Sequence, residues 1–207
     1  ALASLEEAVR LKPDLPEAQG TLGSVLALLD RPAEAVAHFQ QALRSKPHSP
    51  EIQLAYSTAL SDLGRIDEAI EVCRKVVALK GDFPEAHGQL GRLLARKGRL
   101  EEAVASYREA LRLKPDFART HADLGEALAK LGHPAEAVPE YEEALKLKPD
   151  CLEARANLGN VLLLLGRPAD ALPYFQETVK QKPDAQSYYG LGLAFARLGR
   201  TREARTN

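Results

Sequence analysis

Residues 84–117, PEAHGQLGRLLARKGRLEEAVASYREALRLKPDF, are the stretch that decides the fold. Apolar residues recur at helical spacing in two runs, which Gly98 and Arg99 separate and Pro115 closes. Glycine favours the left-handed residue that ends many helices, and proline cannot continue a helix. The stretch therefore predicts two helices joined by a short turn, forming one hairpin.

The hairpin pattern recurs along the chain every 34 residues. We call its closing position the node, and the nodes are Pro13, Pro47, Gly81, Pro115, Pro149 and Pro183. Ten positions after a node stands a small residue, namely Gly23, Ser57, Gly91, Gly125 or Gly159. Twenty-two positions after it stands Ala35, Ala69, Ala103, Ala137 or Ala171, and 26 positions after it Phe39, Cys73, Tyr107, Tyr141 or Phe175. A fixed period of this length is the signature of a helical solenoid.

The segments between the predicted helices carry signals for helix ends. Aspartates directly after a node can begin the capping of the next helix, with Ser49 in that role in the second repeat. These aspartates are Asp14, Asp82, Asp116 and Asp150. Glycines expected to end the first helix of a hairpin are Gly64, Gly98, Gly166 and Gly199. After Pro183 the pattern returns one residue early, which implies a one-residue deletion near residues 184–187.

The small residue ten positions after the node lies inside the first predicted helix. Glycine in a helix interior costs about 1 kcal/mol relative to alanine, so its recurrence needs a compensating contact. We expect this contact to be a close approach of two helices, with Gly91, for example, lying against Ala103.

Together these positions resemble the tetratricopeptide repeat (TPR) family, which has Leu-Gly in the first helix and then Ala, an aromatic residue, Ala and Pro. The resemblance covers essentially the whole chain, with departures at Ser57, Cys73, Gly81 and Thr178. It implies an all-α, right-handed superhelical solenoid of antiparallel helix pairs. The expected divisions are a partial repeat 1–15, full repeats 16–49, 50–83, 84–117, 118–151 and 152–185, and a partial repeat 186–207. Because this single solenoid starts and stops within the repeat frame, we expect a fragment of a longer protein.

Composition excludes several classes of partner. Lysine and arginine total 28 against 29 acidic residues, so the net charge of −1 gives no reason to expect nucleic-acid or anionic-membrane binding. The run Val161–Leu165 is far shorter than the roughly 20 residues that span a bilayer, so we expect a soluble chain without membrane insertion. Cys73 and Cys151 cannot form a disulfide framework. The compartment stays open, with the cytoplasm slightly favoured.

No constellation of residues indicates an enzyme, a cofactor or a metal site. Gly190-Leu191-Gly192 matches part of a dinucleotide fingerprint, but the third glycine and the preceding strand are missing. His87 and His121 occupy the same position in neighbouring repeats, whereas a metal ordinarily needs three or four ligands. We therefore expect both histidines to have a packing role.

The family resemblance implies a concave face, lined by the first helices, that holds an extended peptide or a partner helix. The predicted function is accordingly a non-catalytic scaffold for a protein or peptide partner. The candidate residues on this face are Asn157, Asn160, Arg92, Arg96, Arg119, Glu126, Lys130, Leu164 and Tyr189. Asn157 and Asn160 can donate to and accept from a peptide backbone. Leu163 and Leu164 are apolar where solvent is expected.

Several alternatives stay open at this point. Arg92 and Glu126 share a position one repeat apart, so they can pair internally instead of contacting a ligand. The carboxylate clamp of some family members needs lysine where Ala156 stands, and the asparagine ladder of glycosyltransferases is matched only by Asn157. The chain could instead be a substrate-recruiting arm of a larger enzyme, such as a glycosyltransferase, or a module that self-associates into homo-oligomers through uncapped ends.

Overall fold

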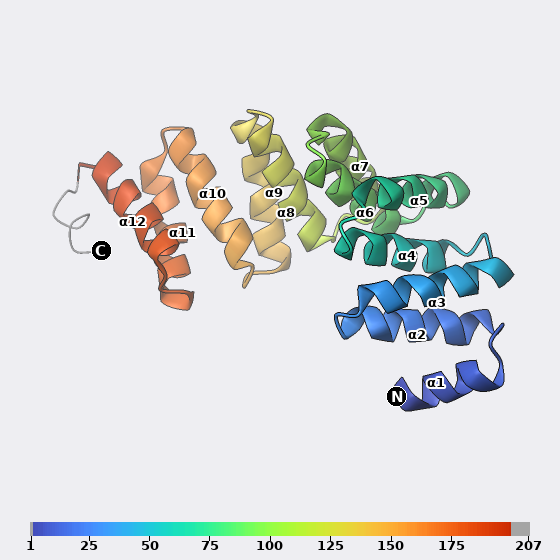
Figure 1. Cartoon of the computed structure of the whole chain (residues 1–207). Coiled ribbons are helices and arrows are strands. Elements are labelled where there is room, and N and C mark those ends of the chain that lie inside the picture. The colour runs from blue at the N-terminus through green and yellow to red at the C-terminus, as the bar shows by residue number, and fades with distance from the viewer. Residues whose placement is uncertain (1, 200–207) are drawn as a thin grey trace. The chain divides into compact units, whose positions relative to one another are not determined.

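The computed structural model describes residues 2–199, and this range contains twelve α-helices and no strands (Figure 1). The predicted all-α solenoid of helix pairs is confirmed, because consecutive helices pack against each other as hairpins. The helices group into two compact units, Ala1–Leu113 and Lys114–Asn207. The division into numbered repeats stays a prediction from the sequence.

The first unit holds seven helices within its described residues. They are α1 (Leu2–Leu11), α2 (Pro16–Leu28), α3 (Pro32–Ser45), α4 (Pro50–Asp62), α5 (Ile66–Leu79), α6 (Pro84–Arg96) and α7 (Leu100–Leu113). The second unit, described to residue 199, holds α8 (Ala118–Lys130), α9 (Pro134–Leu147), α10 (Leu152–Leu164), α11 (Pro168–Gln181) and α12 (Ala185–Arg197). In each hairpin the even-numbered helix comes first, and α1 packs on α2.

The first helices of the hairpins form a row within each unit. In the first unit α2 contacts α4 and α4 contacts α6, and in the second α8 contacts α10 and α10 contacts α12. Over residues 2–199, the backbones of the second helices of one unit do not approach each other in this way, and only long side chains reach between them. Each row of first helices is therefore the more closely spaced side of its unit, as a concave face requires.

The helix ends follow the turn residues only in part. The predicted glycines Gly64, Gly98, Gly166 and Gly199 all have φ between 71° and 76°, so they end the first helices as expected. The capping prediction is wrong for Asp14, Asp82, Asp116 and Asp150. In those repeats the N-cap lies one residue later, on Leu15, Phe83, Phe117 and Cys151, whose side chains make no capping bond. Ser49 does cap α4, because its hydroxyl accepts from the Ile52 amide.

The last turn is shorter than the others. Helix α12 begins two residues after its node, whereas α2, α4, α6, α8 and α10 begin three residues after theirs. The shorter turn places Asp184 at the N-cap, where it forms a capping box with Ser187. The observed shortening agrees with the deletion expected near residues 184–187.

The glycines inside the first helices face aromatic rings and not the alanines that we expected. A Cβ atom added to Gly91 would lie 2.5 Å from the Tyr107 ring, and one added to Gly125 would lie 3.1 Å from the Tyr141 ring. The alanines of that expectation, including Ala103, are fully buried. The ring 26 positions after the node is long enough to reach the facing helix, so the glycine makes room for the ring.

The second repeat keeps this contact with different residues. Ser57 stands in place of the glycine, and Cys73 stands in place of the ring. Both are fully buried, and the Cys73 thiol donates a hydrogen bond to the Ser57 hydroxyl at 3.1 Å. The first helix thus has a serine, which is larger than the usual glycine, and the second helix compensates with a cysteine, which is smaller than the usual aromatic residue.

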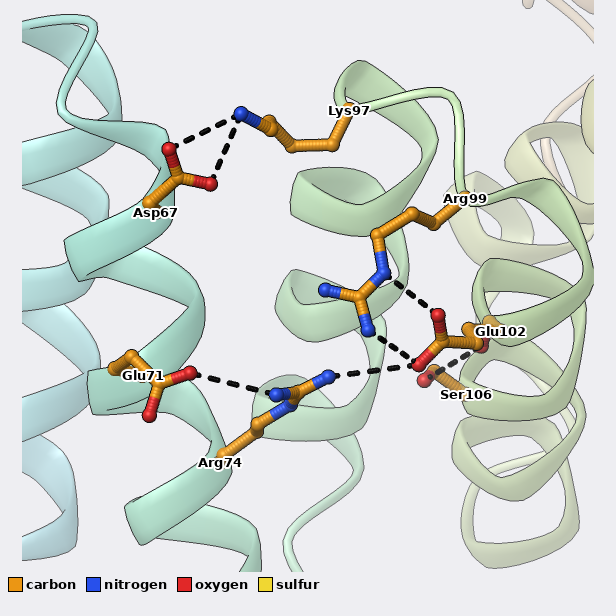
Figure 2. Close-up of polar contacts among 7 residues, drawn as sticks. All are labelled: Asp67, Glu71, Arg74, Lys97, Arg99, Glu102 and Ser106. Carbon is orange, nitrogen blue, oxygen red and sulfur yellow. Dashed lines mark hydrogen bonds and ion pairs between the residues drawn. The ribbon is translucent and has the colours of Figure 1, made fainter.

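Exposed ion pairs link neighbouring repeats on the side of the second helices (Figure 2). Arg74 of α5 lies 3.4 Å from Glu71 on its own helix and 3.5 Å from Glu102 of α7. Lys97, at the end of α6, pairs with Asp67 of α5 at 2.9 Å. Because these side chains are well exposed and screened by solvent, each pair contributes little to the stability of the fold. The apolar contacts and not these pairs must hold the hairpins together.

We predict that Gly91→Ala destabilises the fold by about 1–2 kcal/mol, because overpacking against the buried Tyr107 ring outweighs the gain in helix propensity. Urea unfolding followed by circular dichroism measures the change. Gly20→Ala is the matched control, since its added Cβ would lie an ordinary 3.5 Å from Ile52. It should stabilise by up to about 1 kcal/mol.

A double variant tests the contact itself. Gly91→Ser with Tyr107→Cys copies the pair found at Ser57 and Cys73. We expect the double variant to lose less stability than the two single variants summed, because the larger and smaller residues compensate. Strictly additive losses would contradict the proposed glycine–ring contact.

Candidate functional site: hollows along the first helices

The second unit has an open hollow between α10, α11 and α12 with a volume of about 550 Å3. Three of the candidate residues, Asn157, Asn160 and Tyr189, line it together. The other lining residues are Leu152, Glu153, Ala156, Phe175, Thr178, Lys182, Asp184, Gln186, Ser187 and Gly190. The hollow therefore combines the predicted face of the first helices with residues of α11 and of the turn before α12.

The floor of this hollow is built from small residues around one ring. Phe175 of α11 is 2% exposed and lies against two glycines. An added Cβ would lie 2.8 Å from the ring at Gly159 of α10 and 2.4 Å at Gly190 of α12. Because neither glycine has a side chain, both first helices can approach the ring, and the space above it stays open.

The walls carry polar side chains with few internal partners. Asn160 and Tyr189 are exposed, Tyr189 to 72%. Neither side chain makes a hydrogen bond to any residue in the described range. Asn157 is half-buried and hydrogen-bonds Tyr141. Burial raises the pKa of Tyr141 well above its ordinary value, and the bond with Asn157 opposes this rise. Asn160 and Tyr189 are thus available to a guest, whereas Asn157 already has a partner within the protein.

One ion pair closes the edge of the hollow. Lys182 lies 2.8 Å from Asp184, which also accepts from the Ser187 amide at 2.9 Å as the cap of α12. The Lys182 ammonium and the Ser187 amide lower the pKa of the Asp184 carboxyl to about 2. Asp184 is therefore ionised and engaged within the protein at neutral pH.

The first unit has a hollow of about 400 Å3 at the equivalent repeat positions, between α2 and α4. Its lining residues are Pro16, Glu17, Gly20, Thr21, Ser24, Phe39, Lys46, Ser49, Glu51, Ile52 and Ala55. Each of them occupies the repeat position of a residue that lines the hollow of the second unit. The two hollows are the same site in two different repeats.

The side chains of the first hollow are bonded internally. Thr21 donates its hydroxyl to the Glu17 carbonyl at 2.7 Å, and Ser24 donates to the Gly20 carbonyl at 3.0 Å. Lys46, at the position of Lys182, pairs with the Glu17 carboxylate. This hollow consequently offers fewer free polar groups than the hollow beside α12.

The remaining candidate residues lie outside both hollows. In the first unit, Arg96 donates to the Ser61 carbonyl at 3.2 Å, and Arg92 donates to the side chain of Gln89. In the second unit, Glu126 pairs with Lys130 at 2.6 Å, both on α8.

Two more candidates of the second unit lie at helix ends. Arg119 comes within 3.9 Å of Asp123 on α8. Leu164 is 70% exposed at the end of α10, and it does not line the hollow. Leu163, which we expected to face solvent, is instead only 3% exposed because it turns into the core.

The two histidines that share a repeat position, His87 and His121, hydrogen-bond the backbone at the nodes. The Nε2 atoms of His87 and His121 donate to the carbonyls of Gly81 and Pro115 at 2.9 and 2.8 Å. The other residues at this position, Gln19, Gln53 and Arg155, donate to their own nodes in the same way. Within residues 2–199, no three potential metal-ligating side chains come together. The position thus selects a long side chain with an N–H donor.

His121 makes a second bond, from its Nδ1 atom to Glu140 of α9 at 2.7 Å. Since both ring nitrogens face acceptors, both bonds form only when the ring is protonated. Burial lowers the pKa of His121, but the bonds with Glu140 and Pro115 raise it further, so the net shift is upward.

Comparisons with known proteins identify the family of this fold. The Tetratricopeptide repeat model TPR_16 matches residues 1–50, 122–185 and 165–206, which is more than half of the chain. A second Tetratricopeptide repeat model, TPR_19, matches 26–96 and 60–106, and the TPR repeat model TPR_11 matches 91–132. The chain belongs to the tetratricopeptide repeat family. No curated protein matches it.

Solved structures share the fold. YrrB, described as a TPR protein with an unusual peptide-binding site, has a TM-score of 0.73 and 24% identity over 80% of this chain and 86% of its own. Pseudomonas aeruginosa pilF has a TM-score of 0.81 and 20% identity, over 92% and 87%. TTC0263, a thermophilic TPR protein in Thermus thermophilus, has a TM-score of 0.66 and 25% identity, over 93% and 100%.

In the part of the chain that the structure describes, none of the helices combines the length and the apolar character that crossing a membrane demands.

We predict that His121 makes the stability of the second unit depend on pH. A raised pKa means that the charged ring stabilises the fold fully below the unfolded pKa of about 6.5, and that this contribution is lost as pH rises through the folded pKa. His121→Gln copies the uncharged donor of Gln19 and Gln53.

Urea midpoints at about pH 6 and about pH 9 measure this effect. The free energy of unfolding of the wild type should exceed that of the glutamine variant by up to about 1 kcal/mol at the lower pH. This difference in free energy should shrink at the higher pH. A difference that stays the same at both pH values would contradict the charged bridge to Glu140.

Proposed function

We propose that this chain is a non-catalytic scaffold that binds an extended or helical segment of a protein partner along its first helices. The hollow beside α12 is its main contact in the second unit. One observation carries the proposal: the open hollow of about 550 Å3 presents two polar side chains, Asn160 and Tyr189, that make no bond within the described residues. Polar groups left without partners on a concave surface are the groups that a peptide backbone can satisfy.

The chemistry of the hollow suits a peptide better than a small molecule. Asn160 offers a donor and an acceptor, and Tyr189 presents an exposed ring beside it. Small residues such as Ala156 and Gly190 leave room for a main chain to approach. YrrB, which shares this fold, is described as having an unusual peptide-binding site, and this description supports the same use of the fold here.

We predict that Asn157→Ala with Asn160→Ala weakens partner binding about tenfold, because each lost hydrogen bond is worth roughly 0.5–1.5 kcal/mol. The partner is first identified by pull-down with the whole chain and mass spectrometry. Calorimetric titration then compares the variants with wild type, and thermal melts confirm that each variant is folded.

The equivalent change in the first hollow is the control. Thr21→Ala with Ser24→Ala removes hydroxyls that already bond their own helix, so it should change affinity by less than about threefold. If the asparagine variant bound the partner as tightly as wild type, the hollow beside α12 would not be the contact.

A further inference from the structure

The two equivalent hollows differ in how their acidic side chains are paired. In the first unit, Glu17 pairs with Lys46, which lies 29 positions further along the chain. The next repeat has the same arrangement, in which Lys80 lies 3.3 Å from Glu51. A lysine just before the node therefore neutralises the acid in the first turn of its own hairpin.

The second unit has the same two residues but not the same pair. Glu153 and Lys182 are again 29 positions apart, and both line the hollow beside α12. Lys182 instead lies 2.8 Å from Asp184. Glu153 is exposed, and its side-chain carboxylate forms no ion pair or hydrogen bond with any residue from 2 to 199.

The shortened turn explains the change of partner. Because α12 begins one residue early, Asp184 is its N-cap and bonds both Lys182 and the Ser187 amide. Asp82 is equally close to Lys80 in sequence, but it is not an N-cap and leaves Lys80 paired with Glu51. In the first unit the corresponding N-cap is Ser49, which is uncharged and cannot compete for Lys46. The turn before α12 thus removes the lysine that would otherwise neutralise Glu153.

The remaining charge sets the chemistry of the hollow. Its charged lining residues are Glu153, Lys182 and Asp184, and the last two neutralise each other. Gln186 stands where the first hollow has Glu51, so no second acid is added. The hollow therefore presents one unneutralised carboxylate, and seven residues further along α10 it presents the free amide of Asn160.

We propose that the hollow between α10 and α12 selects a peptide segment with a lysine or arginine side chain, whose cationic head pairs with Glu153. This inference rests on the proposed function, because it names the side chain that the bound segment presents. The side-chain amide of Asn160 hydrogen-bonds the main chain of the bound segment. Glu153 pairs with the cationic side chain of the segment in the same way as Glu17 pairs with Lys46 in the first unit.

Peptide libraries test the inference with the whole chain immobilised. Each library fixes one central residue as lysine, arginine, norleucine or glutamate and randomises three residues on either side, with both ends blocked. We expect the lysine and arginine libraries to be retained about three- to fivefold more than the norleucine library, as suits one part-exposed ion pair. The glutamate library should be retained least.

Two variants should remove this preference. Glu153→Gln deletes the charge and keeps the shape. Asp184→Ser keeps a good N-cap, as Ser49 is, but frees Lys182 to neutralise Glu153. Glu101→Gln is the matched control, since Glu101 is also an exposed acid in a first helical turn but lies on α7 and does not line the hollow. It should keep the preference, and thermal melts confirm that all three variants fold.

The outcomes separate the two proposals. Retention of all four libraries to the same extent, or a cation preference that survives Glu153→Gln, would overturn the charge selection and leave peptide binding in place. Retention of no library above blank resin would overturn both. A cation preference that is lost in Glu153→Gln and Asp184→Ser but kept in Glu101→Gln supports the inference.

Discussion

In four of the described hairpins, the contact between a glycine of the first helix and a ring of the second determines how closely the two helices approach. Gly91 against Tyr107 and Gly159 against Phe175 repeat it in the two units. Because the ring fills the space of the missing side chain, the two helices of such a hairpin pack closely against each other. The hollow beside α12 is a direct product of this contact, since its floor is a ring held between two glycines.

Much of the fold could be predicted because each recurring position has one local requirement. Glycine at positive φ acts through the backbone alone, and this prediction agrees with the structure. The partner of the mid-helix glycine was predicted wrongly. Spacing along two helices does not tell which of Ala103 and Tyr107 faces Gly91, because the ring reaches further than its Cα position suggests. The prediction that aspartates cap the first helices was also wrong. A difference of one residue in the length of the turn decides which residue is the N-cap, and the sequence pattern did not show this difference.

The candidate site was predictable only along the first helices. The family resemblance placed Asn157, Asn160 and Tyr189 on one face, and all three line the hollow beside α12. Lys182 and Asp184 were missed because they come from the turn, where no periodicity applies. The signal that could have revealed them is the recurrence of an acid and a lysine 29 positions apart. Arg96 of α6 and Lys130 of α8 have partners within their own units, and their part in binding stays a prediction.

The shortened turn before α12 has a consequence for how such repeats diversify. Removing one residue leaves the helices, their glycines and their ring in place, yet it moves a carboxylate to where it can capture a lysine. A length change in a loop thereby alters the charge that a neighbouring surface presents, without any substitution on that surface. Insertions and deletions at the nodes can therefore change the charge of one hollow while the rest of the array stays the same. In this way an array of similar repeats can give each hollow its own ligand preference. The same operation is open to protein engineers who build repeat arrays from consensus hairpins.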